Sequence, residues 1–494
     1  MAGIGFELKK LLVGRGAIGK IRAYAYASIV CSGTMLLAIM LLIGIQLLAK
    51  SSGATEHTRE TLVALVVYAM LCSMLLASML QTFLSRYVSD MLYRNTPDRV
   101  IPSLIGASVL LMVPGGAAYA FLLSKTPEVP WIDRALDWLM FMELIPVWLQ
   151  MAYITATKDY RRILMVFAAG IAAALSLGAV LLAAGFNPQT ALIAALAIGY
   201  GVMLVGNTGA LLRYFNAGSG SALAFIEWFS TAPDLIPIGF LGMAGAFAHI
   251  VLMWFGPLGV VVTGPLRQAP LNDAAAFYAF LVMLPANVRF VISVEVNFYR
   301  KYRRYFDAIL GGGTLSEIIV ARNDMIAALK QEVRKLAELQ TAVMLAYIVF
   351  MRYYLQTIGF TTDMIAMFQV MAIGYSAYAI GNCLMLIQLY FNDRKGALMV
   401  AATFFSVNVL VTLQTLKGPP LYYGVGLVAA GIAMYLVAMP RLFLYLRHID
   451  GHVFCGQPLL APKSVSRWSK AASRLNARAD HWAVVRKPDR EVRP

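Results

Sequence analysis

The most regular feature of the chain is a series of long apolar runs separated by short polar segments. An α-helix needs about 20 apolar residues to cross about 30 Å of hydrocarbon. A strand that crosses a membrane instead has about ten residues of alternating polarity, and these runs do not alternate. The chain is therefore predicted to be an all-α integral membrane protein with about twelve transmembrane helices. The runs lie near residues 24–48, 62–84, 101–123, 136–156, 163–184, 190–212, 233–254, 275–297, 338–358, 364–389, 397–416 and 422–446.

Composition supports lipid as the solvent for most of the chain. Hydrophobic residues make up 60% and charged residues 13%, against about 45–50% and 25% in an ordinary soluble domain. A single soluble core could not hide this much apolar surface from water. The four cysteines form no CxxC pair, so neither a disulfide framework nor a zinc site is predicted. No cofactor is expected.

The positive charges indicate how the chain is oriented in the membrane. The formal net charge is +16, which in a soluble protein would suggest a nucleic-acid partner. With both termini placed in the cytoplasm, the twelve-span pattern puts 32 of the 41 Lys and Arg residues on the cytoplasmic side and 7 outside. Because cytoplasmic loops carry an excess of Lys and Arg, this distribution is interpreted as membrane topology, and no nucleic-acid partner is predicted.

The spans and the polar segments divide the chain into successive parts. Residues 4–12 have the spacing of a short interfacial helix within the N-terminal segment. A charged cytoplasmic connection is predicted between the eighth and ninth spans, and a basic cytoplasmic tail after the twelfth. The predicted parts are 1–22, the first six-helix bundle 23–212, a cytoplasmic linker 213–232, the second six-helix bundle 233–449 with the connection 298–337, and the tail 450–494.

The polar residues do not form the constellation of an enzyme. Gly311, Gly312, Gly313 and Thr314 lack the lysine of a phosphate-binding loop. The longest cytoplasmic connection has about 40 residues, which is short for a catalytic domain. A membrane transporter is therefore favoured over an enzyme.

Ionisable residues inside the spans are the candidates for a substrate pathway, because a charge in the bilayer is costly and usually faces a cavity or a partner. These candidates are Glu143 in the fourth span, His249 in the seventh, Arg289 and Glu295 in the eighth, and Arg352 in the ninth. The alternative for each of them is a buried ion pair or a charge at the level of the headgroups. Arg289 and Glu295 lie six residues apart on one helix and point in different directions, so each must find its own partner or water.

A second candidate surface lies at the start of the connection 298–337. Arg300, Lys301, Arg303 and Arg304 alternate there with aromatic residues. Such a cluster could dock a cytosolic partner. It could equally bind anionic lipid headgroups, since each basic residue near an anionic surface contributes about 1 kcal/mol.

Five parts of the chain carry a resemblance to a known family: Met1–Leu12, Tyr24–Ser28 with Ser32-Gly33, Pro233–Leu235, Gly264–Arg267 and Val294–Leu315. They resemble the PelG family, the inner-membrane transport subunits of the Pel exopolysaccharide apparatus. The resemblance covers residues 1 to about 449, with Thr34-Met35 where Pro-Trp is expected. It implies a MATE-like exporter with two six-helix bundles that moves an N-acetylgalactosamine-rich polymer. It also implies a cytosolic glycosyltransferase and small membrane subunits, including a cyclic-di-GMP receptor, as partners.

Two other functions stay open at this point. A cation-coupled exporter of small molecules or lipid-linked sugars needs a buried carboxylate that titrates or binds an ion, and Glu143 is the first candidate. A non-conducting scaffold that only recruits the synthase predicts that no polar cavity lies between the bundles.

Overall fold

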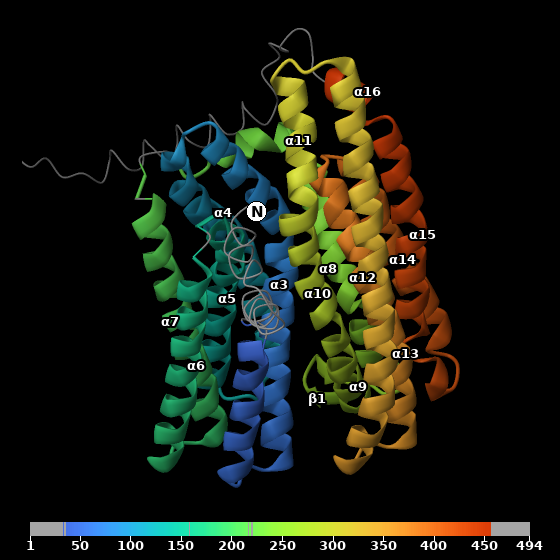
Figure 1. Cartoon of the computed structure of the whole chain (residues 1–494). Coiled ribbons are helices and arrows are strands. Elements are labelled where there is room, and N and C mark those ends of the chain that lie inside the picture. The colour runs from blue at the N-terminus through green and yellow to red at the C-terminus, as the bar shows by residue number, and fades with distance from the viewer. Residues whose placement is uncertain (1–32, 34–35, 158, 216, 219–220, 456–494) are drawn as a thin grey trace, which may run out of the picture.

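The computed structural model describes residues 33, 36–157, 159–215, 217–218 and 221–455. These residues form two lobes of roughly parallel helices that stand side by side (Figure 1). The predicted interfacial helix 4–12 and the tail beyond residue 455 lie outside the described residues. The all-α class and the arrangement in two bundles are confirmed.

The first lobe contains one helix that precedes α3 and five further long helices. Its helices are Leu36–Ser51, α3 (Glu56–Tyr93), α4 (Val100–Ser124), α5 (Trp131–Thr157), α6 (Tyr160–Ala183) and α7 (Pro188–Phe215).

The second lobe follows a linker that includes the 3₁₀ helix Ala224–Ser230. Two short strands lie between its first two helices, α8 and α9. Its elements are α8 (Leu235–Trp254), β1 (Val260–Thr263), β2 (Leu266–Gln268), α9 (Pro270–Phe280), α10 (Leu284–Ile292), α11 (Tyr299–Leu310), α12 (Leu315–Thr357), α13 (Thr362–Tyr390), α14 (Arg394–Thr415), α15 (Val425–Arg447) and α16 (Ile449–Cys455).

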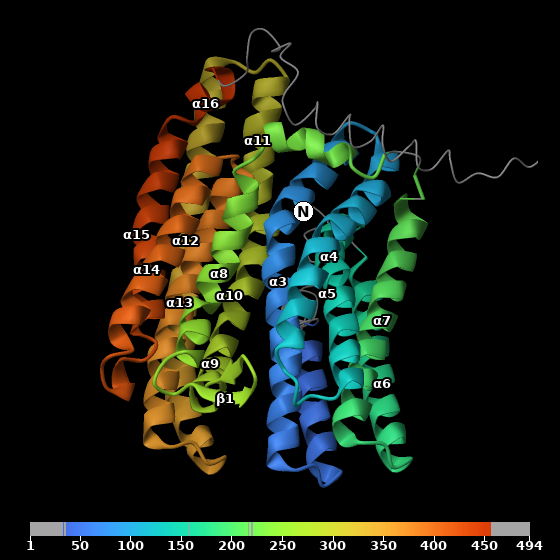
Figure 2. The ribbon, with the colours of Figure 1, turned by 180° about the vertical axis from the view of Figure 1, so that it is seen from behind.

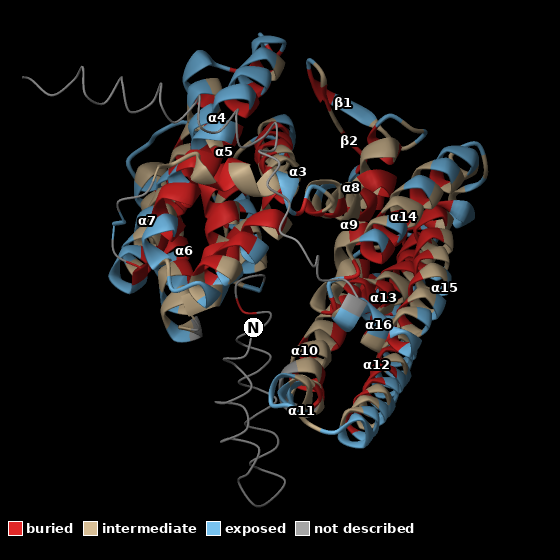
Figure 3. Cartoon of the chain, turned by 90° about the horizontal axis from the view of Figure 1, so that it is seen from above, coloured by how far each residue is buried: buried red, intermediate tan, exposed pale blue. Residues whose placement is uncertain are grey.

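Ten helices in the described part of the chain are long and apolar enough to cross a membrane. Of the two other predicted spans, 24–48 begins outside the described residues, and its visible part is the helix Leu36–Ser51. The span 338–358 is the second half of α12. Buried residues gather between the helices of each lobe, and exposed residues lie around them (Figure 3). The exposed apolar side chains fit a protein that is surrounded by lipid.

The helix predicted at 275–297 is interrupted twice. A 3₁₀ turn, Leu281–Met283, lies between α9 and α10. Pro285, at the start of α10, has no N–H to continue the helical hydrogen bonding. A π-helical turn, Ser293–Phe298, then joins α10 to α11. Irregular backbone at membrane depth is tolerated where it is buried in protein or lines a cavity.

The connection predicted at 298–337 consists mainly of α11 and the first half of α12, and α12 continues from it into the predicted span 338–358. α12 has 43 residues and is therefore about 65 Å long. It begins with a capping box. The Thr314 hydroxyl accepts from the Glu317 N–H, and the Glu317 carboxylate accepts from the Thr314 N–H. A whole bilayer with its headgroups is about 45 Å thick, so α12 is roughly 20 Å longer than the bilayer is thick.

β1 and β2 form an antiparallel hairpin that the sequence prediction does not contain. The hairpin lies beside α3 and α9 at the end of the molecule opposite α11 and α16 (Figure 2). We call this the hairpin end, and we call the opposite end, where α11 meets α12, the tip end. Gly264 in the turn has a φ of +51°, a conformation that glycine adopts without strain.

The lobes meet mainly through α3 and α8. Gly239 of α8 lies against the Ser78 carbonyl of α3, where a Cβ on Gly239 would stand 2.2 Å from the oxygen. This close approach explains why glycine occupies position 239.

Candidate translocation pathway

In the first lobe, Glu143 of α5 faces α7. A Cβ on Gly201 would lie 3.2 Å from the Glu143 Oε1 atom. The other carboxylate oxygen, Oε2, is buried and has no hydrogen-bond partner among the described residues. Two turns further along α5, Gln150 donates to the Thr208 hydroxyl of α7 at 2.8 Å. The α5–α7 contact is therefore a polar seam inside an apolar lobe.

A second buried carboxylate of α5 was missed in the sequence. Asp137 is fully buried, and it accepts a hydrogen bond of 2.7 Å from the Tyr119 hydroxyl of α4. The Tyr119 ring stacks on Phe141 at a centroid distance of 4.2 Å. The available signal was an Asp at the start of the predicted span 136–156, together with Asp133 one turn before it.

In the second lobe, His249 of α8 is buried and pairs with one hydroxyl. Its Nε2 atom lies 3.2 Å from the Tyr375 hydroxyl of α13. Its Nδ1 atom has no partner among the residues that the structure describes. The Tyr375 ring also packs edge-on against Phe280 of α9. His249 thus lies inside the second lobe and not at its surface.

Arg289 finds its partner on α12. Its Nη2 atom donates to the Glu332 Oε2 atom at 2.9 Å, and the Ser293 hydroxyl donates to the same oxygen at 2.8 Å. The side chains of Arg289 and Glu332 are only 13% and 7% exposed. Lys335 lies 3.5 Å from the other Glu332 oxygen. The structure therefore places Arg289 in a buried ion pair, the alternative that the sequence left open.

Glu332 is the first member of a polar stripe along α12 that supports the interrupted helix. Gln340 is fully buried and donates to the Val282 carbonyl in the 3₁₀ turn at 3.0 Å. Tyr347 donates to the Tyr278 carbonyl of α9 at 2.8 Å. Residues seven or eight apart lie on one helix face. One face of α12 thus satisfies polar groups on both sides of the break.

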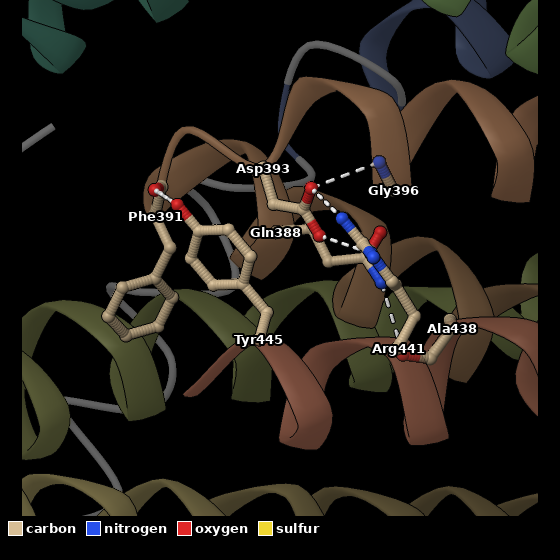
Figure 4. Close-up of polar contacts among 7 residues, drawn as sticks. All are labelled: Gln388, Phe391, Asp393, Gly396, Ala438, Arg441 and Tyr445. Atoms are coloured by element: carbon tan, nitrogen blue, oxygen red, sulfur yellow. Dashed lines mark hydrogen bonds and ion pairs between the residues drawn. The ribbon is translucent and has the colours of Figure 1, made fainter. Parts of the chain in front are cut away.

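At the tip end, the turn between α13 and α14 is held by another ion pair (Figure 4). The Asp393 carboxylate, 4% exposed, accepts hydrogen bonds from Arg441 Nε and Nη2 of α15, each at 2.8 Å. It also caps α14 by accepting from the Gly396 N–H at 3.1 Å. Gln388 donates to the Ala438 carbonyl at 3.1 Å. These contacts fix α13, α14 and α15 to one another.

The two remaining pathway candidates are placed differently. Glu295 belongs to the π-helical turn Ser293–Phe298, and the structure does not describe its side chain. Arg352 is exposed on α12 near the hairpin end. This position matches the charge at headgroup level that the sequence left open for Arg352.

The four candidate docking residues lie on α11, and acidic residues accompany most of them. Lys301 pairs with Asp324 of α12 at 2.9 Å, and Arg304 approaches the same carboxylate at 3.8 Å. Arg303 pairs with Asp307 at 3.4 Å. The hydrogen bond and the charge of Lys301 hold the pKa of Asp324 below its usual value. Arg300 is exposed and also has an interaction partner.

The described residues contain no group of three or more His, Cys, Asp and Glu side chains that could hold a metal ion. Polar side chains instead form small hydrogen-bonded groups inside the two apolar lobes. At the interrupted helix, Arg289, Gln340 and Tyr347 are hydrogen-bonded to other groups of the second lobe.

Comparisons with known proteins agree on one class. A family model, PelG, described as "Putative exopolysaccharide Exporter (EPS-E)", matches residues 1–454. The chain resembles a multidrug resistance MATE family transporter of the MOP superfamily in its outward-facing conformation, with a TM-score of 0.58, 11% identity and coverage of 91% of this chain and 99% of that one. It also resembles a MOP superfamily transporter from Pyrococcus furiosus, with a TM-score of 0.60, 10% identity and coverage of 91% of this chain and 99% of that one. A third similar structure is the eukaryotic MATE transporter AtDTX14, with a TM-score of 0.56, 13% identity and coverage of 96% of this chain and 99% of that one. No curated protein matches the sequence.

Proposed function

The chain belongs to the PelG family of exopolysaccharide exporters, and on this premise we propose that it moves a nascent Pel-type polymer across the bacterial inner membrane. The two-lobe MATE fold and the family make it a membrane transporter and not an enzyme. The proposed cargo is rich in N-acetylgalactosamine, a sugar with hydroxyl and amide groups. It would come from a cytosolic glycosyltransferase.

The interrupted helix of the second lobe is the observation that carries this proposal. Transporters place substrate at discontinuous helices, where the backbone departs from regular hydrogen bonding. The break from Leu281 to Met283 lies inside one candidate span, Pro270–Ile292, and the π-helical turn Ser293–Phe298 follows that span directly. α12 holds the first break itself through Gln340, and the end of α9 before the break through Tyr347. A long scaffold helix can thus stabilise an irregular segment that would otherwise be costly in lipid.

The proposed orientation places the tip end in the cytoplasm and the hairpin end in the periplasm. Cysteine labelling of intact cells should then reach positions 55 and 265 from outside, whereas positions 310 and 470 should react only after the cells are opened. The reason is the excess of Lys and Arg on the segments at the tip end. Labelling of position 470 in intact cells would contradict both this orientation and the even number of spans.

We also propose that the tip end receives the cytosolic partners. α12 is roughly 20 Å longer than a bilayer with its headgroups, and Leu310 at the end of α11 and Leu315 at the start of α12 are 83% and 73% exposed. In the proposed orientation these two leucines lie on the cytoplasmic side of the membrane. The basic residues Arg300, Lys301, Arg303 and Arg304 flank the tip on α11 and remain the proposed docking surface for the glycosyltransferase. Small membrane subunits, including a cyclic-di-GMP receptor, are the other proposed partners.

Synthesis of labelled polymer in membrane vesicles tests the transport proposal. Inverted vesicles that contain the glycosyltransferase and this chain should accumulate labelled polymer in the lumen, where a glycosidase added outside cannot digest it. Vesicles that lack the chain should leave the polymer fully digestible. Equal protection in both would show that the chain is dispensable for export, as a non-conducting scaffold would be.

One observation favours a second candidate, cation-coupled export, for the same fold. The buried Glu143 Oε2 atom lacks a described partner, so this carboxylate is placed to take a proton or a small cation. In the vesicle assay, a cation-coupled exporter should respond to an imposed sodium or proton gradient. The Glu143→Gln variant should lose that response. Gln150→Glu is not a suitable control because Gln150 is already hydrogen-bonded to Thr208.

A further inference from the structure

The hairpin β1–β2 contacts both lobes, although its chain belongs to the second. It follows α8 and precedes α9 directly in sequence. Asp273 of α9 fixes its base, because one carboxylate oxygen accepts from the Trp254 indole N–H at 2.9 Å and from the Ala269 N–H at 3.1 Å. The hairpin is therefore attached to both of its flanking helices in the second lobe.

Tyr68 of α3 holds the hairpin from the first lobe. Its hydroxyl donates to the Arg267 carbonyl at 3.1 Å and accepts from the Arg267 N–H at 3.0 Å. The Tyr68 ring stacks on Trp254, with centroids 4.9 Å apart and planes inclined by 21°. One side chain of the first lobe thus hydrogen-bonds the N–H and carbonyl of Arg267 in β2 and stacks on the Trp254 ring at the end of α8.

The turn of the hairpin makes a second contact, with the loop between α4 and α5. The Thr263 hydroxyl donates to Glu128 at 3.1 Å. A Cβ on Gly264 would stand 2.3 Å from the Lys125 carbonyl oxygen, so the two backbones touch there. Thr263 itself is 2% exposed. The lobes are consequently bridged at two separated points at the hairpin end.

We propose that Tyr68 and the β1–β2 hairpin form the gate at the hairpin end of the transport pathway. This inference rests on the proposed function and specifies where the pathway is closed in this structure. A path between the lobes can open at this end only if both Arg267 hydrogen bonds and the Glu128 contact are released. Tyr68 is a positioning residue that determines how readily the gate opens.

Inter-lobe distance measurements test the gate without any substrate. Spin labels at Glu56→Cys and Leu421→Cys, in a variant without the native cysteines, report the separation of the lobes at the hairpin end. Tyr68→Phe removes two hydrogen bonds, and the open-to-closed ratio should rise about tenfold. Tyr445→Phe is the matched control, because Tyr445 also donates to a main-chain carbonyl, that of Phe391, but within one lobe. An unchanged distance distribution in Tyr68→Phe would overturn the proposal.

Reversible cross-linking tests the gate during export. Lys125→Cys and Pro265→Cys, joined by a bis-methanethiosulfonate reagent, would tie the hairpin to the first lobe. Polymer export in the vesicle assay should fall at least tenfold and return after reduction. Val260→Cys with Gln268→Cys is the control, because these positions are paired within the hairpin and their cross-link should leave export unchanged.

The outcomes separate the gate from the transport function. If export continues while the cross-link joins the two lobes, the gate proposal is overturned and the transport proposal stands. If Tyr68→Phe opens the hairpin end while no vesicle accumulates polymer, the transport proposal fails and the gate stands.

Discussion

Replacing Arg441 with methionine is expected to destabilise the second lobe by about 3 kcal/mol. Breaking a buried ion pair from one side costs about 3–5 kcal/mol, because the remaining charge is left buried and unpaired. The lower end applies here because Arg441 is 38% exposed, whereas Asp393 is only 4% exposed. The midpoint of thermal unfolding, followed by tryptophan fluorescence in detergent, should fall by several degrees.

Two variants control for side effects of that substitution. Arg447→Met changes an exposed arginine of the same helix and should leave the midpoint nearly unchanged. Arg441→Met combined with Asp393→Asn removes the uncompensated charge and should recover most of the loss. If Arg441→Met and Arg447→Met had equal midpoints, the contact in Figure 4 would contribute little to stability.

Arg289→Met is expected to lower protein abundance and polymer export together. The substitution leaves the Glu332 carboxylate, 7% exposed, with only Lys335 and Ser293 beside it. We expect a cost of about 3 kcal/mol, since Lys335 offsets part of the buried charge. Quantitative immunoblots of membrane fractions and the vesicle assay measure the two effects.

The double variant Arg289→Met with Glu332→Met distinguishes a structural pair from a pathway residue. It replaces both charges with apolar side chains, a change that is often neutral or stabilising. Recovery of abundance and export together would mean that the pair only supports the interrupted helix. Recovery of abundance without export would return Arg289 to the substrate pathway.

The sequence predicted most spans well, because an apolar run of about 20 residues has few alternatives in a membrane protein. The predicted span 397–416 corresponds to α14, Arg394–Thr415. Glu332, in contrast, was not predicted to be buried. It lies among charged residues of α12, where a polar segment is normally interpreted as a solvent-exposed connection. Only the fold shows that one face of this segment packs on α10 and buries the carboxylate.

The hairpin shows a local signal that length-based span counting does not detect. Val260, Val261, Val262 and Thr263 are β-branched, and Gly264-Pro265 follows them directly. This pattern is typical of a strand and a turn. The contacts of Tyr68 with Arg267 could not be predicted, because 199 residues separate them in the chain. Long-range pairs of this kind depend on how the lobes pack.

The unbroken length of α12 gives the protein a mechanical lever. A rigid helix of about 65 Å converts a tilt of roughly 5° at one end into a displacement of about 6 Å at the other. The same helix is hydrogen-bonded to the interrupted segment through Glu332, Gln340 and Tyr347. A small tilt of α12 that follows a rearrangement of this segment is therefore amplified into a larger displacement at Leu315. Force applied to that tip is transmitted in the reverse direction, toward the middle of the membrane.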